Sequence, residues 1–250
     1  YFAALDVGGA IGLLTEYGSE AKLLAGGQSL VPMMNFRLVR PSVLIDLNPI
    51  TQLSGIAASD GELVIGSMTR HAEVEFSPLV RGRAPLISEV MPLIGCPSVR
   101  NRGTIGGSVA HADPAADLPV ALLALNATLR ARGPRGHRDI PIDDFFVSLF
   151  TTALAPDEVL MEIRVPAAVP GLGSAFLEFA RRHGDFALVA VAVTMRLVRG
   201  AIADTLRIAL GGVADHPVRA RRAETLLRGV APTPEAFEAA ASAAAGEIDP

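Results

Sequence analysis

The chain has 250 residues, half of them hydrophobic, and a formal net charge of −4. It can therefore bury a sizeable core in two or three modest domains. It has no basic run that would indicate a nucleic-acid partner. Its single cysteine, Cys96, excludes a disulfide, a structural zinc site or an iron–sulfur cluster held by cysteines of this chain. No apolar run approaches the roughly 18 residues of a membrane span and no secretory leader is visible, so we expect a cytoplasmic protein without a transmembrane segment.

The first two thirds of the sequence predict mixed α/β units. Up to about Asp46 the pattern indicates a helix, a strand, a glycine turn, a helix and the strand "SVLIDL". The stretch "ELVIGSMT" predicts a further strand, and "PLVRGRAPLISEVMPLI" is helical in part. Asp117 is expected to cap a buried helix, with Pro119 in the first turn, where its missing N–H does no harm. The segments "ATLRAR" and "DEVLMEIRVP" follow as strands.

The last third predicts an antiparallel sheet with helices. Two long strands are expected to turn at Arg199 and Gly200. The segments "HPVRARRAETLLRG" and "TPEAFEAAASAAAGEI" are expected to be helices, the second capped by Thr233 with Pro234 at its first position. The fold class is therefore mixed α+β, and we expect domains at residues 1–46, 47–170 and 171–250.

Two adjacent glycines, Gly26 and Gly27, separate a predicted strand ending at Leu24 from a predicted helix over residues 29–34. The first N–H groups of a helix have no internal partner and carry partial positive charge. Glycines let a phosphate approach those groups without meeting a Cβ, and Ser29 can add a hydroxyl. A tight strand-to-helix turn or a helix cap explains the same residues, so one loop leaves both interpretations open.

A second loop, "TIGGS" at residues 104–108, repeats the pattern about 80 residues later. Two such loops can converge on the two phosphates of a dinucleotide from opposite sides. Neither loop is a Rossmann fingerprint, because G-x-G-x-x-G and its later acidic residue are absent from the sequence. Neither is a P-loop, because no Gly-Lys-Ser/Thr follows.

The segments "AGGQSLVPMMNFRL" and "VRNRGTIGGSVAHADPAADLP" resemble the medium, FAD-carrying subunit of the molybdenum hydroxylases, the family of aerobic carbon monoxide dehydrogenase and xanthine dehydrogenase. The resemblance continues through "IGSMTRH", "PDEVLMEIRVP" and "ARRHGDFALVAVAV". It implies a small N-terminal and a larger middle unit that clamp FAD between them, in a fold of the vanillyl-alcohol-oxidase-like type. It also implies a C-terminal antiparallel sheet with helices that covers the flavin end.

The resemblance assigns the FAD site residue by residue. The residues that it places in the two FAD loops are Ala25, Gly26, Gly27, Gln28 and Ser29, and then Thr104, Ile105, Gly106, Gly107 and Ser108. Asp117 matches an acid that contacts the sugar-alcohol chain near the flavin, and Leu160 matches an apolar contact to the ring system. Some relatives carry a lysine near the flavin where this chain has Leu177 and Glu178, so any role of that lysine is absent or met by another group.

The resemblance also implies a function. A large partner subunit would hold the molybdenum cofactor, a small one would hold two [2Fe–2S] clusters, and FAD in this chain would pass the electrons to an external acceptor. Peripheral contact with a membrane stays open, and we predict neither a catalytic residue nor a metal site in this chain. Two alternatives remain, a self-sufficient FAD oxidoreductase and a scaffold subunit that has lost its flavin. The sequence does not indicate the substrate or the acceptor.

A few other residues carry weaker expectations. Arg100 and Arg102 could help to neutralise the pyrophosphate or could form ion pairs. We expect His71 at the surface and Cys96 as a small core residue. Asp113 is expected to form an Asx-turn before the following proline.

Overall fold

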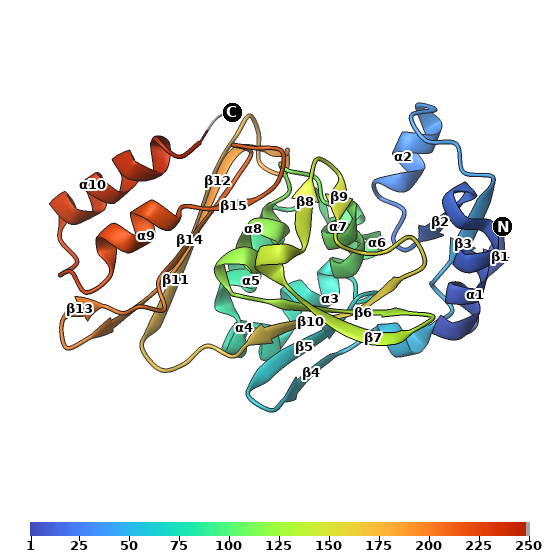
Figure 1. The fold of residues 1–250 in the computed structure, drawn as a ribbon, viewed down its shortest axis with the longest axis horizontal. Coiled ribbons are helices and arrows are strands. Elements are labelled where there is room, and N and C mark those ends of the chain that lie inside the picture. Colours follow the sequence, from blue (N-terminus) through green and yellow to red (C-terminus); the bar gives the residue numbers. More distant parts are fainter. Residues whose placement is uncertain (249–250) are drawn as a thin grey trace.

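The computed structural model describes residues 1–248, and Figure 1 shows three units side by side in a row. The N-terminal unit has a parallel sheet in the order β1–β3–β2. Its elements are β1 (Phe2–Ala3), α1 (Val7–Tyr17), η1 (Gly18–Glu20), β2 (Ala21–Leu24), α2 (Leu30–Asn35) and β3 (Val43–Asp46). The predicted order of helix, strand, glycine turn, helix and strand is confirmed. Strand β1 was not predicted, because two residues are too few to show a periodicity.

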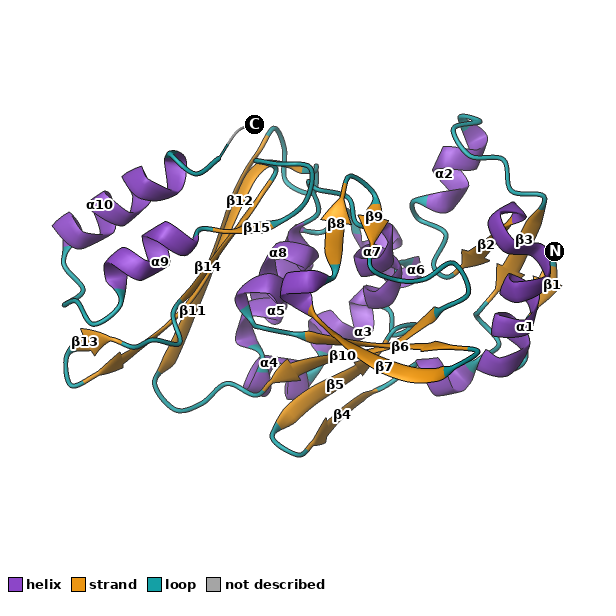
Figure 2. Ribbon diagram, in the orientation of Figure 1, coloured by secondary structure: helices purple, strands orange, loops and turns teal. Residues whose placement is uncertain are grey.

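The middle unit is built on a five-stranded antiparallel sheet in the order β4–β5–β10–β6–β7. The strands are β4 (Ile56–Ser59), β5 (Glu62–Gly66), β6 (Thr128–Gly133), β7 (Gly136–Pro141) and β10 (Val159–Pro166), with the small pair β8 (Phe146–Ser148) and β9 (Thr151–Thr152) beside them. The helices, which Figure 2 shows in purple, are α3 (His71–Phe76), α4 (Pro78–Arg83), α5 (Pro85–Val90), α6 (Pro97–Arg102), α7 (Ile105–His111) and α8 (Asp117–Ala124). Short 3₁₀ turns lie at η2 (Thr51–Leu53), η3 (Met91–Leu93) and η4 (Ile142–Asp144).

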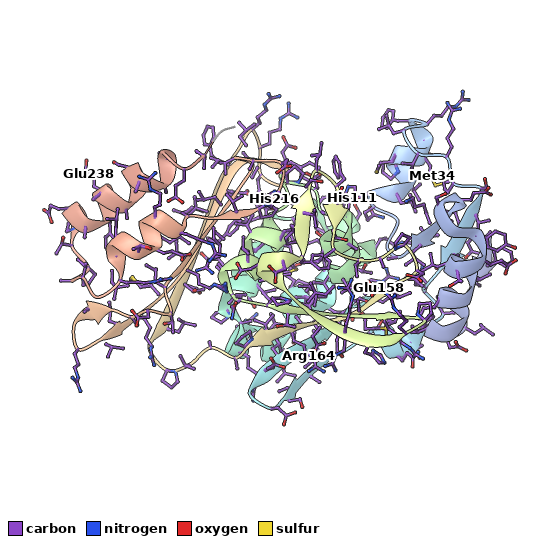
Figure 3. All side chains as sticks on the ribbon, viewed as in Figure 1. Met34, His111, Glu158, Arg164, His216 and Glu238 are labelled. Atoms are coloured by element: carbon purple, nitrogen blue, oxygen red, sulfur yellow. The ribbon has the colours of Figure 1, made fainter. Side chains whose placement is uncertain are left out.

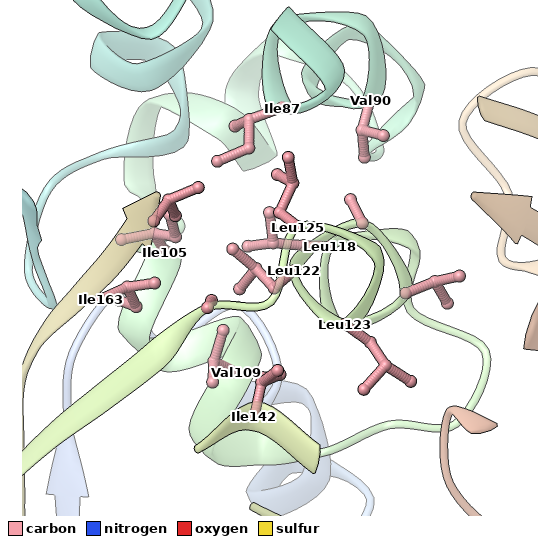
Figure 4. Packing of buried hydrophobic residues seen from close by; sticks show 14 of the residues in the cluster. Ile87, Val90, Ile105, Val109, Leu118, Leu122, Leu123, Leu125, Ile142 and Ile163 are labelled. Carbon is pink, nitrogen blue, oxygen red and sulfur yellow. The ribbon is translucent and has the colours of Figure 1, made fainter. Parts of the chain in front are cut away.

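The main core lies where α5, α7 and α8 meet the middle sheet. Figure 4 shows side chains of these helices pointing toward one another, among them Ile87, Val109 and Leu122. Every residue of α8 is buried, which explains why its sequence is a continuous apolar run rather than an amphipathic one. This fixed helix holds Asp117 at its first turn.

The C-terminal unit has an antiparallel sheet in the order β11–β12–β14–β15, with β13 paired to the end of β12. Its elements are β11 (Leu172–Ala180), β12 (Ala187–Val198), β13 (Ala201–Ile202), β14 (Arg207–Gly211), β15 (Val218–Arg219), α9 (Arg221–Leu227) and α10 (Pro234–Ala245). Alternate residues of β12 face the main core and the helices α9 and α10, because the side chains of a strand alternate between faces. The sheet therefore joins α8 of the middle unit to the C-terminal helices.

Several details differ from the sequence expectations. The turn at Arg199 and Gly200 is confirmed, and both residues have positive φ, at 52° and 83°, as tight hairpin turns require. The second long strand is broken into β13 and β14. The first predicted C-terminal helix begins only at Arg221, because the residues before it form β15. Asp117 is the first residue of α8 and not its cap, a position that Ala116 occupies.

The principal sheets occupy successive stretches of the chain, and the domain bounds 1–46, 47–170 and 171–250 stay a prediction. The mixed α+β fold is the architecture that the residue pattern predicted. Among residues 1–248, no helix is both long enough and apolar enough to cross a membrane.

Candidate cofactor-binding site

A cavity of about 770 Å³ opens between the N-terminal and middle units and extends to the turn between β11 and β12. This cavity, called the cleft below, is lined by both glycine loops, the start of α8 and residues 184–186 of that turn. Figure 3 labels two of its lining residues, His111 and Glu158. Ligand pockets commonly measure about 300–1,000 Å³, so the cleft is large enough for an extended ligand.

All but one of the predicted site residues line the cleft, and those that do are Ala25, Gly26, Gly27, Gln28, Ser29, Thr104, Gly106, Gly107, Ser108, Asp117 and Leu160. The exception is Ile105, which is fully buried in the main core. Its N–H donates to the carbonyl oxygen of Thr69 at 3.0 Å. The structure therefore gives Ile105 a packing role beside the cleft.

The first glycine loop lines the cleft with residues whose backbone N–H groups are unbonded within the described part of the chain. Gly27 has a φ of +72°, which a glycine adopts without strain. None of the backbone N–H groups of residues 26–30 donates a hydrogen bond within the described part of the chain. Helix α2 starts at the end of this row, and Ser29 makes no capping bond with its side chain. Successive free N–H groups in such a loop form a concave anion-binding surface.

The second glycine loop is different, because its N–H groups are already bonded. Gly106 donates to the carbonyl oxygen of Ser67 at 2.8 Å, and Gly107 donates to Oγ1 of Thr104 at 3.1 Å. The N–H groups of Ile105, Gly106 and Gly107 are therefore occupied within the chain, and contact of this loop with FAD stays a prediction. A Cβ on Gly106 would lie 2.5 Å from Cβ of Ser67, so this glycine lets α7 pack closely against the segment after β5.

The two loops lie directly against each other. A Cβ on Gly26 would lie 2.3 Å from the carbonyl oxygen of Arg102, and one on Gly107 would lie 3.6 Å from Cβ of Ala25. What the second loop can offer to a ligand is a side chain, because the Ser108 hydroxyl lines the cleft and makes no hydrogen bond within residues 1–248.

A clamp of two polar side chains ties the loops together. Nη1 of Arg70 donates to the carbonyl oxygen of Arg102, and Nη2 donates to Oδ1 of Asn48 at 2.6 Å. Nδ2 of Asn48 in turn donates to the carbonyl oxygen of Ala25 at 3.1 Å. Sequence analysis did not find Arg70 or Asn48, because neither lies in a glycine motif and only the fold brings them together.

Two family models together match almost the whole chain. Residues 1–168 match the FAD binding domain in molybdopterin dehydrogenase. The chain belongs to the medium, FAD-binding subunits of the molybdenum hydroxylases. Residues 174–250 match the CO dehydrogenase flavoprotein C-terminal domain, so the C-terminal sheet and helices belong to the same family.

Individual relatives agree with this assignment. The medium subunit described here is 44% identical over 250 residues to the carbon monoxide dehydrogenase medium chain of Hydrogenophaga pseudoflava. This match covers all of the present chain and 87% of the relative. The present chain is 42% identical over 250 residues to the 6-hydroxypseudooxynicotine dehydrogenase complex subunit alpha of Paenarthrobacter nicotinovorans, with coverage of 100% and 84%.

A solved structure confirms the fold. It is that of carbon monoxide dehydrogenase from Hydrogenophaga pseudoflava lacking the Mo-pyranopterin moiety of the molybdenum cofactor, and it matches with a TM-score of 0.98 and 46% identity. The match covers all of this chain and 87% of that chain. The α+β fold predicted from the family resemblance is therefore confirmed.

The cleft of this medium subunit also contains buried titratable groups. Asp117 is only 6% exposed, and burial, together with the neighbouring carboxyl of Glu178, raises the pKa of Asp117 to about 7. Burial also lowers the pKa of His111, whose ring lies 5.0 Å from that of Phe150 between centroids. These polar groups are set in a largely apolar wall that includes Leu160, which is 5% exposed.

His71 is buried, so the expectation that it lies at the surface is wrong. It is 4% exposed, lines the cleft behind Gly103, and has no hydrogen-bond partner for either ring nitrogen within residues 1–248. Burial lowers the pKa of His71 to about 4, so the ring is neutral at pH 7.

Arg100 and Cys96 also have definite places. Nε of Arg100 lies 2.7 Å from Oε2 of Glu75, so Arg100 forms the internal ion pair that was one of the two expectations. Cys96 is exposed, and the expectation of a core position is wrong.

The Asx-turn is confirmed, because the N–H of Ala115 donates to Oδ1 of Asp113 at 2.9 Å. Within residues 1–248, no three His, Cys, Asp or Glu side chains are placed to hold a metal ion.

Proposed function

We propose that this subunit holds FAD in the cleft between its two glycine loops and relays electrons from the [2Fe–2S] clusters of a partner subunit to an external acceptor. The observation that carries the proposal is that residues 26–30, whose N–H groups are unbonded within residues 1–248, line a cleft of about 770 Å³. Such donors suit the pyrophosphate of a dinucleotide.

The residues present fit the cofactor from one end to the other. The first loop would hold the pyrophosphate, with the hydroxyls of Ser29 and Ser108 as further donors. Asp117 would bind the sugar-alcohol chain, and Leu160 would contact the ring system. When bound, FAD supplies the redox chemistry, while the chain supplies position, hydrogen bonds and a shielded wall.

The relatives' names support a relay rather than a substrate site. One is named for carbon monoxide and the other for a nicotine-derived compound, although both are more than 40% identical to this chain. Complexes named for such different compounds thus have medium subunits related to this one, which supports selection of the substrate in another subunit. We therefore propose that a large subunit with the molybdenum cofactor selects the substrate and that a small subunit carries the iron–sulfur clusters. A cytoplasmic location stays a prediction.

Exposed apolar side chains support the presence of partner subunits. Leu177 and Phe179 on the edge strand β11 are 76% and 67% exposed, and Phe186 in the next turn is 64% exposed. Large apolar side chains gathered at one edge are typical of surfaces that another chain covers.

The test follows the path of the electrons. The purified complex should contain flavin, molybdenum and iron–sulfur centres, and its oxidised flavin spectrum should bleach when substrate is added. The same substrate should leave the spectrum of the isolated flavin-loaded subunit unchanged, because in this proposal the large partner subunit oxidises the substrate. Direct reduction of the isolated subunit by an organic substrate other than NADH would favour the self-sufficient oxidoreductase. A complex without flavin would favour the scaffold.

A further inference from the structure

Two carboxyl groups meet where the C-terminal sheet reaches the cleft. Asp117, the first residue of α8, lines the cleft. Glu178 of β11 pairs with Ala190, which is buried in the main core on β12, a strand that packs against α8. This register makes the carboxyl of Glu178 a neighbour of the Asp117 carboxyl. Oδ1 of Asp117 and Oε2 of Glu178 are buried, and neither has a hydrogen-bond donor within residues 1–248. Glu178 itself is not among the residues that line the cleft.

Two ionised carboxylates in this position would be unfavourable, because an ionised carboxylate can only accept hydrogen bonds. Both would be buried acceptors without a donor, and their like charges would repel. One proton between them turns the contact into a hydrogen bond and lowers the charge of the pair from two to one. The raised pKa of Asp117, about 7, has these same causes, burial first and Glu178 second.

The neighbouring charges do not neutralise the pair. The elements packed against α8 and β11 carry the titratable side chains Glu89 on α5, His111 on α7, Asp143 and Asp144 on η4, Arg196 on β12, Arg207 on β14 and Arg219 on β15. Arg207 and Arg219 both pair with Asp143. An oxygen of Glu89 accepts from the N–H of Phe176 at 3.2 Å. Within the described residues, Glu178 is the charged group that acts on Asp117.

We propose that Asp117 and Glu178 hold one proton between them at neutral pH, and that this proton makes Asp117 a hydrogen-bond donor to a hydroxyl-bearing ligand in the cleft. Glu178 is then a positioning residue that acts through Asp117. The inference rests on the proposed function, because the ligand hydroxyls it names are those of the sugar-alcohol chain of FAD.

A shared proton makes FAD binding depend on pH in a definite direction. Bound FAD removes water from around Asp117 and brings the negative pyrophosphate into the same cleft. Both effects disfavour a second negative charge on the pair, so the bound state holds the proton more tightly than the free state. Binding therefore takes up a proton, and FAD affinity falls as the pH rises through the Asp117 pKa of about 7.

The experiment measures FAD affinity by quenching of flavin fluorescence between about pH 6 and 8.5, with the full chain in the complex that it forms. In the wild type, affinity should fall by up to about tenfold per pH unit above the Asp117 pKa. Glu178→Gln removes the repelling charge and supplies an amide donor, so the pKa of Asp117 falls and the loss of affinity begins at a lower pH than in the wild type. Asp117→Asn should give a flat profile. Glu235→Gln, on the exposed side of α10, is the matched control and should keep the wild-type profile.

A second measurement does not depend on FAD. The infrared C=O stretch of a protonated carboxyl should be present at neutral pH in the FAD-free wild type and in Glu235→Gln, and lost in Asp117→Asn and Glu178→Gln. Failure to bind FAD at any pH overturns the proposed function, whereas the infrared band still decides whether the proton is shared. FAD binding with a pH-independent affinity overturns the inference, and so does a Glu178→Gln variant with the wild-type profile.

Discussion

Both glycine loops line the cleft, but their backbone N–H groups differ. Those of residues 26–30 in the first loop make no hydrogen bond within residues 1–248. Those of Ile105, Gly106 and Gly107 in the second loop donate to oxygens of Thr69, Ser67 and Thr104. The second loop is thereby fixed to the turn after β5, and the first loop rests on it through the contact of Gly26 with Arg102. Adjacent glycines therefore serve two purposes in this chain. In both loops a glycine lets two backbones meet, and in the first loop the N–H groups also stay unbonded within residues 1–248, which suits the proposed ligand.

The largest expected effect is a loss of folding stability when a glycine of the second loop is replaced. Gly106→Ala would place a Cβ 2.5 Å from Cβ and 2.6 Å from the carbonyl oxygen of Ser67. Because both atoms belong to a packed segment, we expect a loss of about 3 kcal/mol in unfolding free energy, measured by urea denaturation. The control is Gly12→Ala in α1, where a Cβ meets nothing within 4 Å, and it should stabilise the chain slightly. Equal stabilities of the two variants would contradict the packing role of Gly106.

The next largest expected effect is a loss of FAD affinity when a glycine of the first loop is replaced. Gly27→Val would put a branched side chain on the cleft wall and disturb the row of N–H donors, so FAD should bind at least about a hundredfold more weakly. A valine at positive φ also strains the backbone, which Gly61→Val controls for. Gly61 has a φ of +81°, lies in the β4–β5 turn and has nothing near its Cβ position. If both variants lose FAD equally, strain and not the cleft explains the loss.

A third prediction concerns the buried wall behind the second loop. His71 has a folded pKa of about 4, below its ordinary 6.5, so its contribution to stability is fully present above pH 6.5 and is lost as the pH falls toward 4. Relative to His71→Leu, the wild type should lose about 1.4 kcal/mol of unfolding free energy for each pH unit in that window. The exposed His183→Leu is the control and should track the wild type. A constant difference between wild type and His71→Leu would show that His71 is not held neutral.

The smallest effect tests the clamp that joins the loops. Arg70→Met removes the hydrogen bonds to Asn48 and Arg102, so the first loop should hold its N–H groups less firmly. Because these groups are partly exposed, we expect a loss of only about 1 kcal/mol, or roughly fivefold in FAD affinity. Arg164→Met, which removes an arginine that pairs with Glu162 on the middle sheet, is the matched control and should leave FAD affinity unchanged (Figure 3). An equal loss in both variants would argue against the clamp.

Features with a local cause could be predicted from the sequence. Strand β2, the hairpin turn at Arg199 and Gly200, and the capped start of α10 at Thr233 all follow from residues that are close along the chain. The placement of His71 and Cys96 was wrong, because a single polar or small residue carries no periodic signal of burial. The sequence could not show that the N–H groups of Ile105 and Gly106 are already bonded, since their acceptors are on Thr69 and Ser67, far away in the sequence.

The sequence by itself determined the order of the longer helices and strands, because periodicity, glycine and proline act on neighbouring residues. Its two glycine motifs indicated the family and two of the segments that line the cleft. Only the tertiary structure decided which loop keeps its N–H groups free, that Arg70 and Asn48 tie the loops together, and that Asp117 meets Glu178. The physical reason is that a donor is free or bonded, and a carboxyl ionised or protonated, according to groups that are distant along the chain and become neighbours only when the chain folds.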